Sequence, residues 1–237
     1  DNMNKSINGE IEKYLEKYPP ALKVYRELIR IGDVYIMGGL LREYKDNNRI
    51  EELRDADFTV YIKKQEKWDQ LLAEIPNRVN RFGGHKFKCS GFIIDVWDVK
   101  ETWALKNKII EVEENKIFEY LPRSVFLNVD ALVYDLSNDK WNDGIYRQAM
   151  LERKIDVVLE NNPFIELNLL RAMILKRKYK MQYSEKLASL ICEHYCSKQD
   201  FARELLETQS KRYGYSVLTQ TDINHEIDIC KNIEKQC

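Results

Sequence analysis

The chain has 237 residues, with 38 lysines and arginines against 39 aspartates and glutamates, so its formal net charge is −1. Its hydrophobic fraction of 44% is typical of globular proteins and exceeds that of disordered chains. A net charge near zero excludes a uniformly basic surface but leaves room for local basic and acidic faces.

Targeting and redox signals are few. No apolar run approaches the roughly 18 residues of a membrane span, and the first residues lack the apolar core of a signal peptide. The five cysteines are scattered, and the Cys192, His194, Cys196 spacing matches no usual zinc pattern. We therefore expect reduced thiols, no membrane association and a cytoplasmic location.

The N-terminal part predicts two short helices within residues 8–31. Apolar residues recur with helical spacing from position 11 to 18, where Pro19 and Pro20 interrupt them. The spacing resumes at position 22, and Gly32 ends it.

Short β-like runs follow at positions 34–37, 58–62, 86–90, 92–97 and 129–136, with a helical stretch near 66–75. Gly91 lies between two of these runs, where a hairpin turn is expected. This part of the chain therefore predicts a sheet with flanking helices.

After about residue 142 the strand patterns stop. Helical patterns occupy positions 164–179, 184–196 and 198–213, and a last one starts near Asp222. Asn161 and Asn162 before Pro163 indicate a helix start. The sequence thus predicts an α+β domain over residues 1–140 and an all-helical domain over residues 141–237.

A pair of glycines follows the first predicted strand. Gly38 and Gly39 lead directly into a helix. Glycines at such a turn let a phosphate approach the backbone, and the helix N-terminus offers free N–H groups. The same pair is also compatible with an ordinary tight turn.

Three aspartates lie on the predicted strands. Asp55 and Asp57 share one face of their strand, because side chains alternate. Asp95 interrupts an otherwise apolar strand, where an unpaired carboxylate is costly. If the two strands are neighbours, three carboxylates meet, and such oxygen ligands suit two Mg²⁺ ions, or Mn²⁺, in phosphoryl transfer. Asp98 is expected on the other face.

This combination resembles the nucleotidyltransferase superfamily, most closely the head domain of bacterial-type poly(A) polymerases and class II CCA-adding tRNA nucleotidyltransferases. The matching segments are Gly38-Gly39-Leu40-Leu41-Arg42-Glu43, Asp55-Ala56-Asp57, Asp130-Ala131-Leu132-Val133-Tyr134 and the neck-like Leu170-Arg171-Ala172. The resemblance implies a nucleotidyltransferase-type mixed sheet followed by a helical neck and body.

The resemblance also implies the roles of individual residues. Asp55, Asp57 and Asp95 would be the catalytic metal ligands. The nucleotide would be bound by Gly38, Gly39, Arg42, Arg123, Asp130 and Arg171. The family's base-reading Glu-Asp-x-x-Arg motif is absent, because the aligned stretch reads Phe164-Ile165-Glu166-Leu167-Asn168.

The helical half carries a candidate RNA surface. Its basic residues, next to tyrosines, are Arg171, Lys176, Arg177, Lys178 and Lys180. Basic and aromatic side chains together can bind a phosphate backbone and stack on bases. A solvated helix face explains the same pattern equally well.

The resulting hypothesis is a Mg²⁺-dependent transfer of NMP from an NTP, with ATP as the expected donor, to an acceptor hydroxyl with release of pyrophosphate. An RNA 3′ end is the favoured acceptor, by resemblance. Nucleotidylation of a small molecule or protein is an alternative, as is a nucleotide- or RNA-binding module of a defence or toxin–antitoxin system without turnover. The sequence leaves the oligomeric state open.

Overall fold

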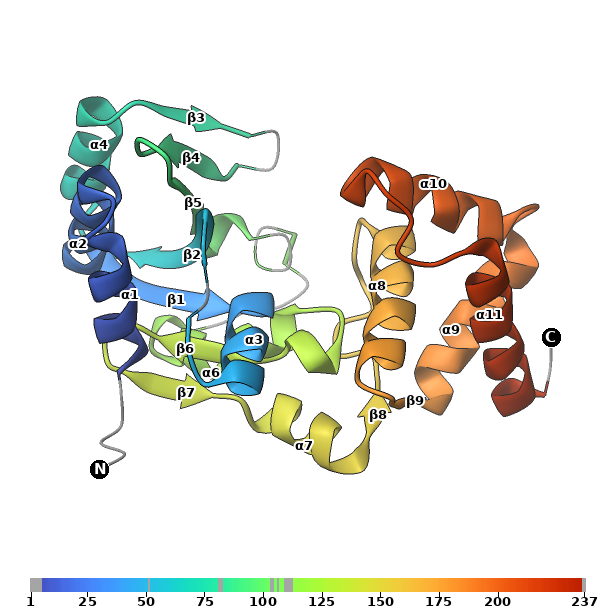
Figure 1. Ribbon diagram of the computed structural model, residues 1–237. Helices are drawn as coiled ribbons and strands as arrows, with labels where there is room; N and C mark the ends of the chain where they lie inside the picture. The colour runs from blue at the N-terminus through green and yellow to red at the C-terminus, as the bar shows by residue number, and fades with distance from the viewer. Residues whose placement is uncertain are drawn as a thin grey trace. The chain divides into compact units, whose positions relative to one another are not determined.

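The computed structural model describes residues 6–50, 52–80, 83–102, 105, 107–108 and 113–235 (Figure 1). The chain divides into two compact units. The first comprises Asp1–Ser124 and Asp130–Gly144, and the second comprises Val125–Val129 and Ile145–Cys237. None of the described helices is both long enough and apolar enough to cross a membrane.

The two N-terminal helices form as expected, as α1 (Ile7–Leu15) and α2 (Pro19–Ile31). The prolines occupy the first positions of α2, where a missing N–H breaks no helical hydrogen bond. Gly32 ends α2 and opens the first strand. A Cβ at Gly32 would lie 1.9 Å from the Tyr61 carbonyl oxygen, so only glycine fits there.

The first unit is built on a seven-stranded mixed sheet in the order β3-β4-β5-β2-β1-β6-β7. The strands are β1 (Gly32–Met37), β2 (Asp55–Ile62), β3 (Asn77–Val79), β4 (His85–Lys88), β5 (Ile93–Asp98), β6 (Val133–Asp135) and β7 (Lys140–Asn142). β2 and β5 are parallel, and the other neighbours are antiparallel.

Helices and turns connect these strands. They are α3 (Gly39–Asn47), α4 (Gln65–Glu74), η1 (Val99–Glu101), η2 (Glu114–Lys116), α6 (Ile117–Tyr120), η3 (Leu121–Ser124) and η4 (Asn128–Asp130). The hairpin expected at Gly91 is present, with φ of 46° at Ser90 and 96° at Gly91. Two positive φ values in succession suit the right-handed twist of the paired strands.

One expected strand is shorter than predicted. The run at positions 129–136 is a strand only from Val133 to Asp135. Before it, the Asn128 side chain donates to the Lys154 carbonyl and accepts the N–H of Asp156, at 2.9 and 3.0 Å. These bonds lie within the second unit, to which Val125–Val129 belong, so the start of the predicted run is not part of the sheet.

The two faces of the sheet differ in character. On one face Phe58, Phe87 and Ile94 are completely buried. Phe58 packs against Tyr25 of α2 and Phe87 against Trp68 of α4, with ring centroids 5.4 and 6.4 Å apart. This face is the core side, so Asp55 and Asp57 of β2, Lys86 and Lys88 of β4 and Asp95 of β5 project from the opposite face.

The second unit contains α7 (Gly144–Glu152), which begins at the last residue of the first unit, and α8 (Ile165–Lys178), α9 (Glu185–Ser197), α10 (Phe201–Tyr213) and α11 (Gln220–Glu234). The prediction that strands stop after residue 142 is wrong. Two short strands, β8 (Lys154–Ile155) and β9 (Gln182–Tyr183), pair in parallel.

The expected start of α8 also needs correction. The Asn162 side chain accepts the backbone N–H of Phe164 at 2.9 Å, and the helix begins at Ile165. Pro163 therefore belongs to the preceding turn and not to the first helical position. The Asn–Pro signal is real, but it marks a loop that leads into the helix.

None of the described cysteines forms a disulfide. Cys89, Cys192 and Cys230 are buried, Cys196 is exposed, and Cys237 lies outside the described residues. Burial raises the pKa of the Cys89 thiol above its ordinary value.

Candidate active site

Three aspartates lie on the polar face of the sheet, as the sequence predicted. β2 and β5 are adjacent and parallel, and Asp57 is directly paired with Asp95. Asp55 precedes Asp57 by two residues and shares its face. The alternation places Asp98 on the opposite face, where it accepts the backbone N–H of Lys100 at 2.9 Å.

The environment of Asp95 favours its protonated form. Partial burial raises the pKa of the Asp95 carboxyl above its ordinary value, and the negative charge of Asp55 raises it further. The positive charge of Lys86, its partner on β4, and a hydrogen bond shared with Asp57 act in the opposite direction. The three carboxylates therefore interact, and a cation among them would relieve their repulsion.

These carboxylates fit a magnesium ion in their chemistry. Among the residues that the structure describes, no three His, Cys, Asp or Glu side chains stand close enough to form a ready-made metal cage. Mg²⁺ does not require one, because it is usually bound through one or two carboxylates, with water and substrate phosphates completing its shell. Asp57 and Asp95, in direct register, can supply such a pair.

The glycine pair forms the junction between β1 and α3. Gly38 has φ of 74° and ψ of −130°, a conformation that side-chain-bearing residues rarely adopt. Its N–H donates to the Leu132 carbonyl at 3.2 Å, and its carbonyl accepts the N–H of Arg42 at 3.1 Å. A Cβ at Gly38 would meet no atom within 4 Å, so open space lies beside this backbone.

The N-terminus of α3 is suited to bind an anion. No side chain caps it, and no acidic residue lies in its first turn. Its first N–H groups therefore lack the side-chain acceptor that most helices provide. Free N–H groups, the helix dipole and open space at Gly38 together make a suitable phosphate position.

Arg42 and Asp130 form a buried ion pair behind this junction. Their side chains are only 8% and 14% exposed. A Cβ at Gly39 would lie 3.7 Å from a terminal nitrogen of Arg42, so the guanidinium lies against the glycine loop. The structure brings these two predicted nucleotide-binding residues together. Their ion pair packs against Gly39 and so stabilises the glycine loop.

Two further predicted nucleotide-binding residues, Arg123 and Arg171, lie on other elements. Arg123 is in η3, where its guanidinium is 5.6 Å from the centre of the Tyr120 ring. Arg171 lies on α8 in the second unit and is half-buried. Their roles toward a nucleotide stay predictions.

Two of the five basic residues of the candidate RNA surface form ion pairs within the protein. The Lys176 ammonium lies 2.8 Å from both carboxylate oxygens of Glu226, which is completely buried. Arg177 pairs with Asp222 at 3.1 Å and lies 3.6 Å from Glu226. Lys176 and Arg177 are therefore explained by ion pairs within the helical unit, without an RNA ligand.

One group of residues near the acids was missed from sequence. Lys86 and Lys88 lie on the same face of β4, and Lys86 pairs with Asp95 across the strands. Alternation within the run His85–Lys88 carries this information. It becomes meaningful only when the neighbouring strand is known.

Comparisons with known proteins give one consistent result. No protein-family model matches the chain, and no curated protein matches it by sequence. Its structure is similar to that of a CCA-adding enzyme in complex with ATP, with a TM-score of 0.58 and 19% identity over 94% of this chain and 54% of the other.

Two further solved structures agree. A CCA-adding enzyme in complex with CTP gives a TM-score of 0.58 and 18% identity, over 94% of this chain and 55% of that one. The Thermotoga maritima CCA-adding enzyme complexed with tRNA gives 0.56 and 18%, over the same shares. The chain thus spans about half the length of these enzymes. The resemblance inferred from the motifs is confirmed at the level of structure, and the chain has the α+β fold of the CCA-adding nucleotidyltransferases.

Proposed function

We propose that this chain is a divalent-metal-dependent nucleotidyltransferase that transfers NMP from an NTP to the 3′ hydroxyl of an RNA and releases pyrophosphate. The observation that carries the proposal is the direct register of Asp57 and Asp95, with Asp55 on the same face, beside an uncapped glycine–helix junction. ATP is the expected donor. The similar structures bound to ATP, CTP and tRNA support nucleotide and RNA ligands.

The glycine junction would hold the triphosphate. Phosphate oxygens placed at Gly38 and Gly39 would accept hydrogen bonds from the first N–H groups of α3. The Arg42–Asp130 ion pair would keep this loop in place through its packing against Gly39. Because Arg42 is neutralised by Asp130, its main contribution would be positioning.

The acids would hold the metal and manage the proton. Mg²⁺ held by Asp57 and Asp95, with Asp55 on the same face, would offset the charge that develops on the phosphoryl group. The acceptor oxygen attacks the α-phosphorus as the bond to pyrophosphate breaks, and the hydroxyl proton must leave. Asp95, whose carboxyl pKa is raised, is suited to accept this proton.

The absent base-reading motif leaves the nucleotide and acceptor to experiment. The test is incubation of the protein with each α-labelled NTP, Mg²⁺ and total cellular RNA, followed by separation of RNA, protein and small molecules. Label on RNA is the expected result. Label found only on protein or small molecules would show that the acceptor is not RNA. Nucleotide binding without any pyrophosphate release would show that the chain is not a catalyst.

A further inference from the structure

A basic pocket lies on the β3–β4 hairpin, on the same sheet as the acids. Its volume is about 420 Å³, and it is lined by Pro76, Asn77, Arg78, Asn80, Lys86 and Lys88. Half of these residues are cationic, and none is acidic. The pocket therefore favours an anion.

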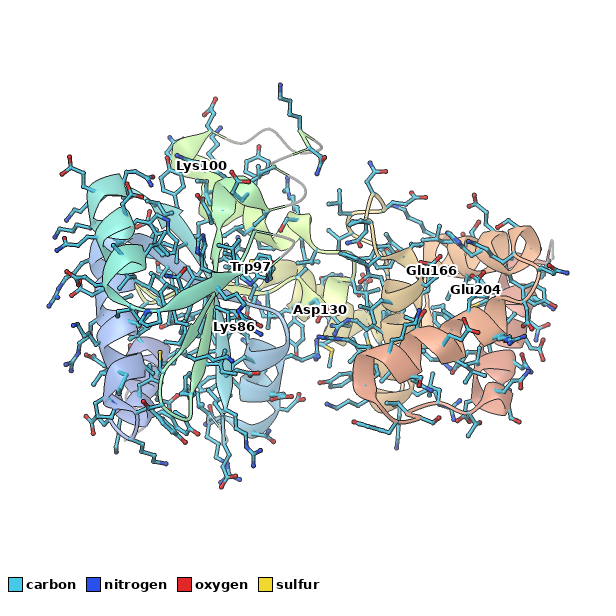
Figure 2. The ribbon with its side chains drawn as sticks, turned by 90° about the horizontal axis from the view of Figure 1, so that it is seen from above. Lys86, Trp97, Lys100, Asp130, Glu166 and Glu204 are labelled. Carbon is cyan, nitrogen blue, oxygen red and sulfur yellow. The ribbon has the colours of Figure 1, made fainter. Side chains whose placement is uncertain are left out.

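Strand register places the pocket in line with the carboxylates. Arg78 pairs with Lys86, Lys86 pairs with Asp95, and Asp95 pairs with Asp57. Directly paired residues project from the same face of a sheet. A row of two cations followed by two carboxylates thus crosses four adjacent strands. Figure 2 labels Lys86 of this row and Trp97 of β5.

Among the described residues Arg78 and Lys88 have no carboxylate partner, and Lys86 has only Asp95, on which its charge acts across the strands. Other basic residues of this unit do have one. Lys45 pairs with Asp143 at 2.6 Å and Lys63 with Asp33 at 3.0 Å. Three neighbouring cations that share a single nearby carboxylate repel one another, and a bound anion would reduce that cost.

The walls of the pocket are fixed by internal hydrogen bonds. The Asn77 amide donates to the carbonyls of Leu72 and Ile75, both at 2.9 Å. The Asn80 side chain accepts the N–H of Gly84 at 3.0 Å, and a Cβ at Gly84 would come within 2.9 Å of the Trp97 ring. The cations therefore project from a backbone that is already ordered.

Protection of a sheet edge explains only part of this pattern. Charged side chains on edge strands prevent pairing with other chains, and Arg78 lies on the edge strand β3. Lys86 and Lys88 lie one strand further in, where no edge needs protection. Their placement beside Asp95 calls for another reason.

The order of the strands indicates which phosphate would be bound. The glycine junction follows β1, the acids lie on β2 and β5, and the cations lie on β4 and β3. In an in-line displacement the leaving pyrophosphate and the attacking hydroxyl lie on opposite sides of the phosphorus. With pyrophosphate at the β1 side, the attacking strand approaches from the β4 side.

We propose that Arg78, Lys86 and Lys88 bind a backbone phosphate of the acceptor strand and so bring its terminal hydroxyl to the acids. This inference rests on the proposed function. A phosphate of the donor nucleotide has the same chemistry, so the experiment measures the two ligands separately.

The experiment compares two triple variants. Arg78→Gln/Lys86→Gln/Lys88→Gln removes the cluster, and Lys23→Gln/Lys64→Gln/Lys67→Gln removes equal charge from exposed positions on or beside the helices α2 and α4. Binding of a fluorescein-labelled single-stranded oligoribonucleotide is measured by anisotropy with EDTA and without NTP. Binding of ATP with Mg²⁺ is measured by calorimetry, and melting temperatures confirm folding.

The cluster variant should bind the oligonucleotide on the order of tenfold more weakly, while the control and all ATP affinities stay unchanged. The slope of its salt dependence should become shallower by about 0.7, since one single-strand phosphate contact contributes roughly that amount. Unchanged oligonucleotide binding, an equal loss in the control, or a loss confined to ATP would overturn the inference.

The same data separate this inference from the proposed function. A wild-type chain that binds RNA through these residues but transfers no nucleotide would contradict the function and leave the phosphate subsite standing. A chain that transfers nucleotide with unchanged binding in the cluster variant would leave the function standing and refute the subsite.

Discussion

Glu226→Ala should strongly destabilise the helical unit. The Glu226 side chain is 0% exposed, and the Lys176 side chain is 16% exposed, with the ammonium 2.8 Å from both carboxylate oxygens. The Tyr183 hydroxyl donates to the same carboxylate at 3.2 Å. Burial and the charge of Glu226 raise the pKa of Tyr183, so this hydroxyl stays a neutral donor.

The magnitude follows from what the substitution leaves behind. A shielded ammonium and a buried hydroxyl would both lose their acceptor, and removing one partner of a buried ion pair typically costs about 3–5 kcal/mol. The free energy of unfolding is measured by urea denaturation with circular dichroism. A Lys176 ammonium that binds Glu226 would have to break this ion pair to bind RNA, so the result also tests the structural role of Lys176.

Glu207→Ala is the matched control. Its carboxylate lies 3.3 Å from Arg203, but the side chains are 59% and 74% exposed. Such a surface pair is expected to contribute about 0.5 kcal/mol or less. If Glu226→Ala and Glu207→Ala change stability equally, the assignment of Glu226 as a buried structural hub is wrong.

Three further outcomes are expected in the first unit. Gly38→Ala should lower stability by about 1–3 kcal/mol in urea denaturation because of its backbone conformation, although no atom blocks a methyl group; an unchanged midpoint would contradict this. Asp95→Asn should lower NMP transfer by at least about 100-fold. The Asp95→Asn protein should also be more stable than the wild type at neutral pH but not in acid. The Asp95 carboxyl has a raised pKa in the folded state, so its ionisation destabilises the wild-type fold as the pH rises, and an asparagine cannot ionise. Parallel pH–stability profiles of the two proteins would contradict this prediction. Arg42→Met should cost about 3 kcal/mol by removing the guanidinium that pairs with the buried Asp130 carboxylate. Arg42→Met/Asp130→Leu should regain part of that loss, whereas additive losses in fluorescence-monitored unfolding would disprove coupling.

Five of the seven strands and the acids were predictable because local patterns determine them, whereas the three-residue strands β3 and β7 were not predicted. Alternation placed Asp55 and Asp57 on one face, and a single charge in an apolar strand identified Asp95. Gly91 predicted its turn, because left-handed backbone favours glycine. The sequence did not show that the strands of Asp57 and Asp95 are neighbours, and the pairing of β2 with β5 in the structure does.

Long-range partners account for what the sequence could not show. Lys176 lies in a helical pattern and Lys86 in a strand pattern, and neither pattern shows what the lysine contacts. One is 50 residues from its buried partner Glu226, and the other faces a pocket that exists only once β3, β4 and β5 are paired. The two-residue strands β8 and β9 are too short to produce a periodic pattern.

The central claim is that Asp57 acts with Asp95 in metal-dependent NMP transfer. The most direct measurement is pyrophosphate release and labelling of RNA by Asp57→Asn in Mg²⁺, beside Asp69→Asn on the exposed surface of α4. We expect Asp57→Asn to lose transfer by at least about 100-fold with an unchanged fold, while Asp69→Asn keeps it. Retained transfer in Asp57→Asn would contradict the role of Asp57 as a catalytic metal ligand.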